Sequence, residues 1–415
     1  MVERIDDDSA VKTLYQLILG RRPSLKELKA TAFTEESNRL LAVMTSLYES
    51  KEQAPHRYMT AVIDISNKCN LRCRMCYFSH DSYYYVKPGF MSPETFTNVA
   101  DVVLPHAGTL TLSCGSEPLC SPYFVEILKI TSKYELQNLD FCTNGILLTK
   151  KRADAVIESG VTEIMFSVDA ATKETYEYIR RGADFGRLLR NIEYLVKRKE
   201  AAGLKIPRLR FNVTLMQKNI AELADLVTLA ANLGVTSLDF RHLVVYEGLG
   251  VEKESLVHNK QLANYWLDVA RARAGELGLE VVACPENFSA DASIDERKTQ
   301  KRGWKDRLKF LKPVKQLLRP TGKKAPPAAD LYCNLPFTYV LVNSAGGVFP
   351  CPHCHGVQPF GLLSESPFGK IWLNDKYMNL RSRILENNPP EMCQRCPSAG
   401  KGKVENSRSF ESRQN

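Results

Sequence analysis

The chain has 415 residues and a formal net charge of +9 at pH 7. Its 44% hydrophobic and 25% charged residues are ordinary for globular domains, which excludes a collagen, a disordered chain and a multispan membrane protein. The sequence has no uninterrupted apolar run of about 18 residues, and its first ten residues are acidic and lack the apolar core of a secretion signal. We therefore expect a cytoplasmic protein with two to four folding units, or one large barrel with additions.

The predicted secondary structure begins with helices at Ala10–Leu19, Ser24–Ala32 and Glu35–Ser50, to which we assign no chemistry. From about Tyr58, strands and helices alternate, which predicts a parallel sheet. The predicted strands are Ala61–Ser66, Thr109–Ser113, Leu139–Thr143, Glu163–Val168, Arg208–Thr214 and Ser237–Phe240. The predicted helices between them are Ser92–Leu104, Tyr123–Lys133, Lys151–Ser159, Thr172–Arg180, Asp184–Ala202 and Ile220–Asn232.

Six such units are too few for a closed eight-stranded barrel. The predicted fold class is therefore α/β: a partial (β/α)6 TIM-like barrel with a small N-terminal helical segment and a C-terminal Cys-rich α+β module. In barrel folds the chemistry lies on the loops that follow the strands. The expected domains are a helical segment 1–55, the barrel 56–290, a basic linker 291–330, the Cys-rich module 331–400 and a disordered tail 401–415.

Almost all of the positive charge lies in one segment. Residues 297–324 contain twelve Lys or Arg and one acidic residue, so this segment carries +11 and the rest of the chain −2. Aromatic residues are not interleaved through it as a single-strand binder would need, so we expect no nucleic-acid partner. The favoured interpretation is a solvated linker. The alternative is peripheral contact with a membrane or acidic surface through the basic, amphipathic Trp304–Leu318, in which Pro313 would produce a kink.

Eight of the twelve cysteines fall into groups whose spacing indicates metal sites rather than disulfides. Cys69, Cys73 and Cys76 follow the first predicted strand directly. Three thiolates this close together hold three corners of a [4Fe–4S] cube and leave the fourth iron open for a cofactor. A Zn²⁺ site is the alternative for the same three residues.

This C-x3-C-x2-C loop and the motifs after it resemble the radical S-adenosylmethionine (SAM) superfamily. Gly115-Ser116-Glu117-Pro118 is similar to the family's Gly-Gly-Glu-Pro motif, with Ser116 in place of the second glycine, and Thr143-Asn144-Gly145 and Ser167-Val168-Asp169 end the next two strands. The resemblance implies that SAM binds the open iron. It also implies SAM contacts from residues of these motifs and from one helix: Gly115, Ser116, Glu117, Pro118, Asn144, Ser167, Asp169 and Arg180. Asn212 is a weaker candidate for such a contact. Arg181 is the alternative to Arg180 as the partner of the SAM carboxylate.

The C-terminal cysteines flank a predicted β-hairpin around Gly346-Gly347 and resemble the SPASM-type extension of radical SAM enzymes, which carries an auxiliary [4Fe–4S] cluster. The resemblance implies that four cysteines are the ligands of this cluster: Cys333, Cys351, Cys393 and Cys396. Cys354 is the alternative to Cys351. A structural Zn²⁺ held by four thiolates has the same signature in isolation.

Four cysteines belong to neither group: Cys114, Cys120, Cys142 and Cys284. A thiol can donate a hydrogen atom to a carbon radical, and position favours Cys120 and Cys284 for that role. The alternative is that each is a buried, small apolar residue.

The resemblance implies an enzyme that uses a reductant such as flavodoxin or ferredoxin to cleave SAM, and that then abstracts a hydrogen atom from its substrate. Residues 1–55 are too short, and lack the strands, to form a winged-helix peptide-recognition module. We therefore expect a carbohydrate or other small-molecule substrate that is oxidised or epimerised, with the auxiliary cluster assisting electron transfer. A peptide maturase is the alternative, and a zinc-stabilised nucleic-acid-binding module is a remote one.

Overall fold

The computed structural model describes residues 59–80, 89–113, 115–246, 248–288, 333, 335–354, 358–385, 388–394 and 396. The predicted N-terminal helices, the basic segment 297–324, the tail 401–415 and Cys114 lie outside the described residues, and the domain boundaries stay predictions. In the part of the chain that is described, no helix is both long and apolar enough to cross a bilayer.

One ten-stranded sheet runs through the described residues, in the order β10-β9-β8-β1-β2-β3-β4-β5-β6-β7. Seven neighbouring strands pair in parallel: β1 (Met59–Ile63), β2 (Ala107–Leu112), β3 (Asn138–Thr143), β4 (Glu163–Ser167), β5 (Arg208–Leu215), β6 (Ser237–His242) and β7 (Glu280–Ala283). Since β7 and β10 are the two ends of this order, the sheet is open, which confirms the predicted partial barrel.

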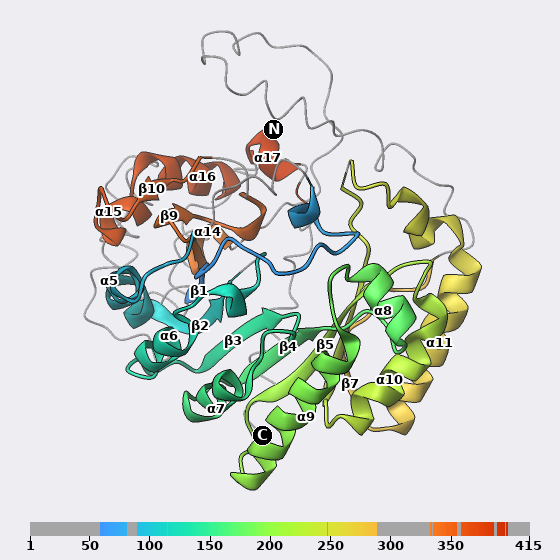
Figure 1. Ribbon diagram of the computed structural model, residues 1–415. Helices are drawn as coiled ribbons and strands as arrows, with labels where there is room; N and C mark the ends of the chain where they lie inside the picture. Colours follow the sequence, from blue (N-terminus) through green and yellow to red (C-terminus); the bar gives the residue numbers. More distant parts are fainter. Residues whose placement is uncertain are drawn as a thin grey trace, which may run out of the picture.

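Helices follow the strands and cover one face of the sheet (Figure 1). They are α5 (Pro93–Val103), α6 (Phe124–Thr131), α7 (Lys150–Glu158), α8 (Lys173–Ile179), α9 (Phe185–Ala201), α10 (Leu223–Asn232) and α11 (Lys260–Glu276). Short 3-10 helices are η1 (Tyr77–Ser79), η2 (Leu104–His106), η3 (Pro118–Cys120), η4 (Ile220–Glu222), η5 (Glu252–Glu254), η6 (Leu256–His258) and η8 (Pro352–Cys354). The predicted helices agree within two residues, except that Ile220–Asn232 begins with the separate turn η4.

Alternating side chains give the sheet an apolar face and a polar face. Phe141 on β3 and Phe166 on β4 are fully buried in the core beneath the helices. Cys142 and Ser167, one residue away from each, therefore point to the opposite face. Because the strands are parallel, their carboxyl ends meet along one edge, and the motif loops lie together there.

The C-terminal hairpin joins the barrel sheet, which its sequence did not predict. β8 (Tyr339–Val342) pairs in parallel with β1, β9 (Gly347–Phe349) pairs antiparallel with β8, and β10 (Gly361–Leu362) follows. The predicted hairpin itself is confirmed: its turn is closed by Asn343, whose Oδ1 accepts hydrogen bonds from the Ala345 and Gly347 amides. The remaining elements are α14 (Leu335–Thr338), α15 (Phe368–Trp372), α16 (Asp375–Leu385) and α17 (Glu391–Gln394), which lie beside the hairpin in Figure 1.

Candidate active site

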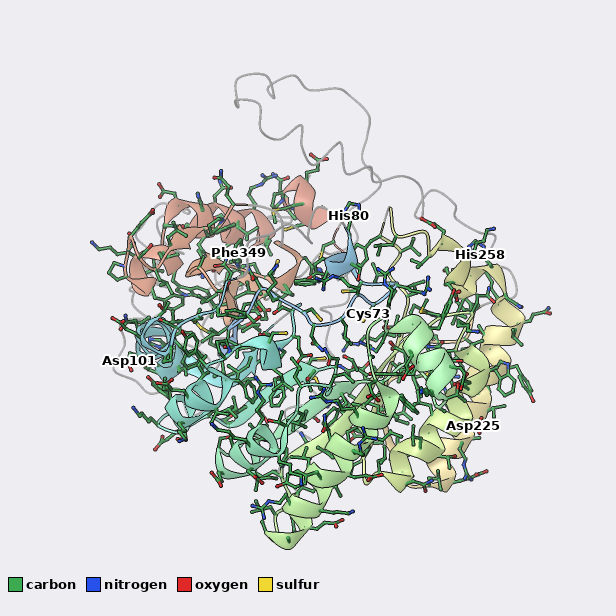
Figure 2. The ribbon with its side chains drawn as sticks, in the orientation of Figure 1. Cys73, His80, Asp101, Asp225, His258 and Phe349 are labelled. Atoms are coloured by element: carbon green, nitrogen blue, oxygen red, sulfur yellow. The ribbon has the colours of Figure 1, made fainter. Side chains whose placement is uncertain are left out.

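The three-cysteine loop, residues 69–76, follows β1 at the carboxyl edge of the sheet. Cys73 is buried, and Cys69 and Cys76 are partly buried. Figure 2 shows Cys73 near the centre of the molecule. The loop turns back on itself because the Cys76 amide donates to the Cys73 carbonyl over 3.1 Å, and Ser79 Oγ donates to the same carbonyl over 2.8 Å. The three thiols are thus held by main-chain geometry as well as by their spacing.

The end of α8 holds this loop in place from more than 100 residues away in sequence. The Arg72 amide donates to the Arg181 carbonyl and the Arg74 amide to the Ile179 carbonyl, each over 2.9 Å. Arg74 Nε also donates to the Tyr178 carbonyl over 2.8 Å. Three carbonyls of one helix terminus therefore fix the segment that carries Cys73.

N–H groups are directed at the sulfur atoms. The Leu71 amide lies 3.4 Å from Cys69 Sγ, Asn144 Nδ2 lies 3.9 Å from the same sulfur, and Arg180 Nη1 lies 3.8 Å from Cys73 Sγ. Burial raises the pKa of Cys73 to about 11 and also raises that of Cys69, so metal charge is needed to stabilise the thiolates. Thiols supplied with N–H donors fit an iron–sulfur cluster, whose potential responds to such hydrogen bonds.

Glu117 joins the loops after β2 and β3. Its buried carboxylate accepts from the Leu119 amide (3.1 Å) and Thr143 Oγ1 (2.6 Å) at Oε1, and from the Asn144 amide (2.8 Å) at Oε2. Burial raises the pKa of Glu117, and the three donors oppose that change. Because a carboxylate has about four acceptor positions, one remains for a ligand such as the amino group of SAM.

The other residues of the 115–118 motif pack against the three-cysteine loop and its flanks. An added Cβ at Gly115 would meet Tyr77 Oη, so this part of the motif packs closely against η1. Ser116 Oγ donates to the Ser66 carbonyl, an anchor that a second glycine would not supply. Pro118 begins η3. The motif is therefore part of the framework of the loop as well as a candidate cofactor contact.

Asp169 and Arg180 form a buried ion pair at the ends of β4 and α8. Asp169 Oδ2 lies 2.7 Å from Arg180 Nε, and Asp169 Oδ1 accepts from the Thr214 amide over 2.8 Å. Burial lowers the pKa of Arg180, but Asp169, Cys73 and Tyr176 together more than offset this, so that the pKa rises. Arg181 is exposed, so Arg180 is the arginine that the fold places at the site. The sequence indicated each residue separately and missed their pairing.

Ser167 and Asn212 face each other in register on β4 and β5, with Cys142 beside them on β3. Ser167 Oγ lies 3.4 Å from Cys142 Sγ, and Asn212 Nδ2 lies 3.8 Å from the same sulfur. Burial raises the pKa of Cys142, so the group stays a thiol. In the sequence analysis, Cys142 belonged to neither cysteine group. Because side chains alternate between the two faces of a strand, Cys142 and Ser167 are expected on the same face at neighbouring strand ends, and this pattern could have connected them.

The structure separates the two thiols that were favoured as hydrogen donors. Cys120 Sγ lies 3.8 Å from Asn70 Oδ1, next to the three-cysteine loop. Cys284 follows β7, at the far edge of the sheet from the hairpin, where it hydrogen-bonds to Arg271. A donor role for either stays a prediction.

The four predicted auxiliary ligands lie in three separate segments of the chain. Burial, together with the nearby thiols of Cys351, Cys333 and Cys396, raises the pKa of Cys393 to about 12. The Cys396 amide donates to the Cys393 carbonyl over 3.0 Å, which turns the final pair. Within the described ranges, no three Cys, His, Asp or Glu side chains are placed to hold a metal ion as they stand. The choice between Cys351 and Cys354 stays a prediction.

Comparison with known proteins agrees with this arrangement. Residues 63–230 match the model of the radical SAM superfamily, and residues 333–397 match SPASM, an iron–sulfur cluster-binding domain. The protein contains a radical SAM domain and a SPASM domain. Its cofactors are a SAM-binding [4Fe–4S] cluster, an auxiliary [4Fe–4S] cluster and SAM, which displaces both zinc interpretations. The individual ligands remain proposals.

Several curated proteins are similar to this chain in sequence. A probable GTP 3′,8-cyclase of Methanocaldococcus jannaschii is 28% identical over 41% of this chain and 55% of its own length. GTP 3′,8-cyclase of Alkaliphilus metalliredigens is 23% identical over 81% of this chain and 95% of its own. The mycofactocin maturase MftC of Mycobacterium tuberculosis is 23% identical over 81% and 74%. This chain thus spans little more than half of the first of these relatives.

Solved structures show the same fold. SuiB of Streptococcus suis bound to S-adenosylmethionine has a TM-score of 0.57 at 15% identity, covering 86% of this chain and 76% of that chain. SuiB bound to its precursor peptide SuiA has a TM-score of 0.55 at 13% identity, covering 91% and 84%.

Proposed function

We propose that the protein is a radical SAM enzyme that modifies a peptide substrate, with its cluster held by Cys69, Cys73 and Cys76. When bound, the cluster and SAM supply a 5′-deoxyadenosyl radical that removes a hydrogen atom from a substrate carbon. The observation that carries the proposal is that the loops after β2 and β3 and the end of α8 meet at the three-cysteine loop. It is visible in the contacts of Asn144 and Arg180 with the cysteine sulfurs.

The residues of this chain bind and orient. Glu117 and Asn144 link the loops after β2 and β3 to the three-cysteine loop and leave an acceptor for an ammonium group. Ser167 and Asn212 present a hydroxyl and an amide on the polar face of the sheet, where the described structure gives Asn212 Oδ1 no hydrogen-bond partner. An unsatisfied buried acceptor fits a ligand hydroxyl at this position.

A peptide is the substrate class that the comparisons favour over a carbohydrate. MftC is named as a maturase, SuiB was solved with a precursor peptide, and neither the relatives nor the structures described above are named for a sugar. The expectation of a carbohydrate or other small-molecule substrate rested on residues 1–55, which lie outside the described residues. Whether the reaction is an oxidation or an epimerisation stays a prediction.

The residues that follow β6 support a peptide substrate rather than a nucleotide such as GTP. Val244, Val245 and Tyr246 follow one another there, with exposed fractions of 60%, 37% and 39%. The Tyr246 ring lies 5.4 Å from that of Tyr77, directly after the three-cysteine loop. An exposed run of apolar residues beside the site suits side chains of an extended peptide better than a triphosphate.

The test is an anaerobic incubation of the reconstituted protein with SAM, dithionite and either a pool of random-sequence peptides or a set of monosaccharides. We expect the peptide pool to raise 5′-deoxyadenosine formation several-fold above the substrate-free rate and the sugars to leave it unchanged. The C73A variant, which lacks one cluster ligand, should form none.

Two results would contradict the proposal. Stimulation by the sugars alone would restore the carbohydrate expectation. Formation of 5′-deoxyadenosine by C73A at the wild-type rate would show that the three-cysteine loop does not hold the SAM-binding cluster.

A further inference from the structure

Arg180 is held rigidly from both sides. Its main chain lies between Ile179 and Arg181, whose carbonyls accept from the amides that flank Cys73, and its Nε lies 2.7 Å from Asp169 Oδ2. Asp169 is fixed in turn by the Thr214 amide at Oδ1 and by Asn219, whose Nδ2 donates to the Asp169 carbonyl over 2.7 Å. The guanidinium therefore has one orientation that satisfies all of these contacts.

That orientation points Nη1 at Cys73 Sγ, 3.8 Å away, in surroundings from which water is excluded. The side chain of Arg180 is 10% exposed and that of Asp169 is fully buried. An N–H donor and a positive charge beside a thiolate ligand stabilise the more negative, reduced state of an iron–sulfur cluster. Low local polarity strengthens this effect compared with a charge in solvent.

We propose that Arg180, positioned by Asp169, raises the reduction potential of the SAM-binding cluster through its contact with Cys73 Sγ. This role differs from pairing with the SAM carboxylate, because it acts on the cluster before SAM binds. The proposal rests on ligation of the cluster by Cys69, Cys73 and Cys76 and is independent of the substrate. If the proposal about Arg180 fails, the proposed peptide substrate is therefore unaffected.

The experiment is a redox titration of the SAM-binding cluster, followed by electron paramagnetic resonance and carried out without SAM or substrate. The auxiliary ligands are left intact, and the two clusters are distinguished by adding SAM to a separate sample, which alters only the signal of the cluster with an open iron. R180Q, which removes the charge and the contact, should shift the midpoint of that cluster to a more negative potential. R180K keeps a charge but not the planar fork that spans Asp169 and Cys73, so its shift should be negative and smaller.

R181Q is the matched control, since it removes the same charge from the next residue, which is exposed, and solvent screens its effect. Its midpoint should equal that of the wild type. A cluster-loaded R180Q with the wild-type midpoint, or with a more positive one, overturns the proposal, even if its affinity for SAM falls. If R180Q does not assemble the cluster, R180K decides: a negative shift supports the proposal, and an unchanged midpoint overturns it.

Discussion

Side chains on the polar face of the sheet show how burial changes the behaviour of single residues. Asp140 on β3 lies in a network in which Arg210 Nη2 donates to Glu163 Oε1 over 2.8 Å. Asp140 Oδ1 itself is buried without a hydrogen-bond partner within the described structure. Burial raises the pKa of Asp140 to about 6, and Thr111 and Arg210 oppose that change. This carboxyl therefore destabilises the folded protein when it ionises.

The sign of the resulting pH dependence follows from the raised pKa. The folded state holds the Asp140 proton more tightly than the unfolded state. The stabilisation of the folded state by this proton is therefore lost as pH rises from about 4 to about 6. D140N removes the ionisation. The quantity to compare is the free energy of unfolding of D140N minus that of the wild type. We expect this difference to be about 1 kcal/mol larger at pH 7.5 than at pH 5.0.

Anaerobic denaturant unfolding of both proteins at the two pH values measures this difference. E193Q, a change of an exposed carboxyl on α9, is the control and should show no such pH dependence. An equal effect of D140N at both pH values would mean that Asp140 ionises normally.

At the scale of elements, the hairpin matters because it removes a free strand edge. In a sheet that ended at β1, this strand would present unpaired amides and carbonyls to solvent. Instead β8 pairs with it, and Val340 opposite Ala61 is fully buried. The strand that leads into the three-cysteine loop is thus enclosed on both edges. The stability of the hairpin turn should therefore affect the whole sheet.

A glycine substitution in the turn and one in α11 are expected to change the free energy of unfolding in opposite directions. Gly346 has a φ of +80°, which disfavours a side chain, so G346A should lower the free energy of unfolding by about 1 kcal/mol. Gly275 lies near the end of α11 with no atom within 4 Å of an added Cβ, so G275A should raise it by up to about 1 kcal/mol. Denaturant midpoints at pH 7.5 measure both. If G346A is as stable as the wild type, the turn does not limit the stability of the sheet.

Across the whole molecule, the barrel and the SPASM domain share one continuous sheet, so the cluster ligands of both belong to a single framework. The four proposed auxiliary ligands come from the start of α14, the end of the hairpin and the α17 turn. Removal of one should therefore release the auxiliary cluster without removing the three-cysteine loop.

C351A should bind about four iron atoms per chain, against about eight in the wild type, and should still cleave SAM without modifying substrate. C354A is the matched control and should keep the full iron content. Iron and sulfide analysis after anaerobic reconstitution measures both. The reverse result, with iron lost only in C354A, would assign Cys354 in place of Cys351.

Much of this protein was predictable because its signals are local. The alternation of strand and helix patterns depends on neighbours in sequence, and the structure confirms it. The spacing of Cys69, Cys73 and Cys76 is local too, and their role as cluster ligands stays a prediction. The turn at Asn343–Gly346 was predictable for the same reason. The expected carbohydrate or other small-molecule substrate, by contrast, was inferred from a missing module, whereas the similarity to MftC and SuiB favours a peptide.

The sequence alone determined the elements, the cysteine groups and the order of the motifs. The tertiary structure decided that Asp169 binds Arg180, that Arg180 reaches Cys73, that Cys142 lies beside Ser167, and that the C-terminal hairpin pairs with β1. Each of these contacts joins residues from different elements, and most of them are far apart in the chain. They follow from strand order and register, which result from the packing of the whole sheet and have no local pattern in the sequence.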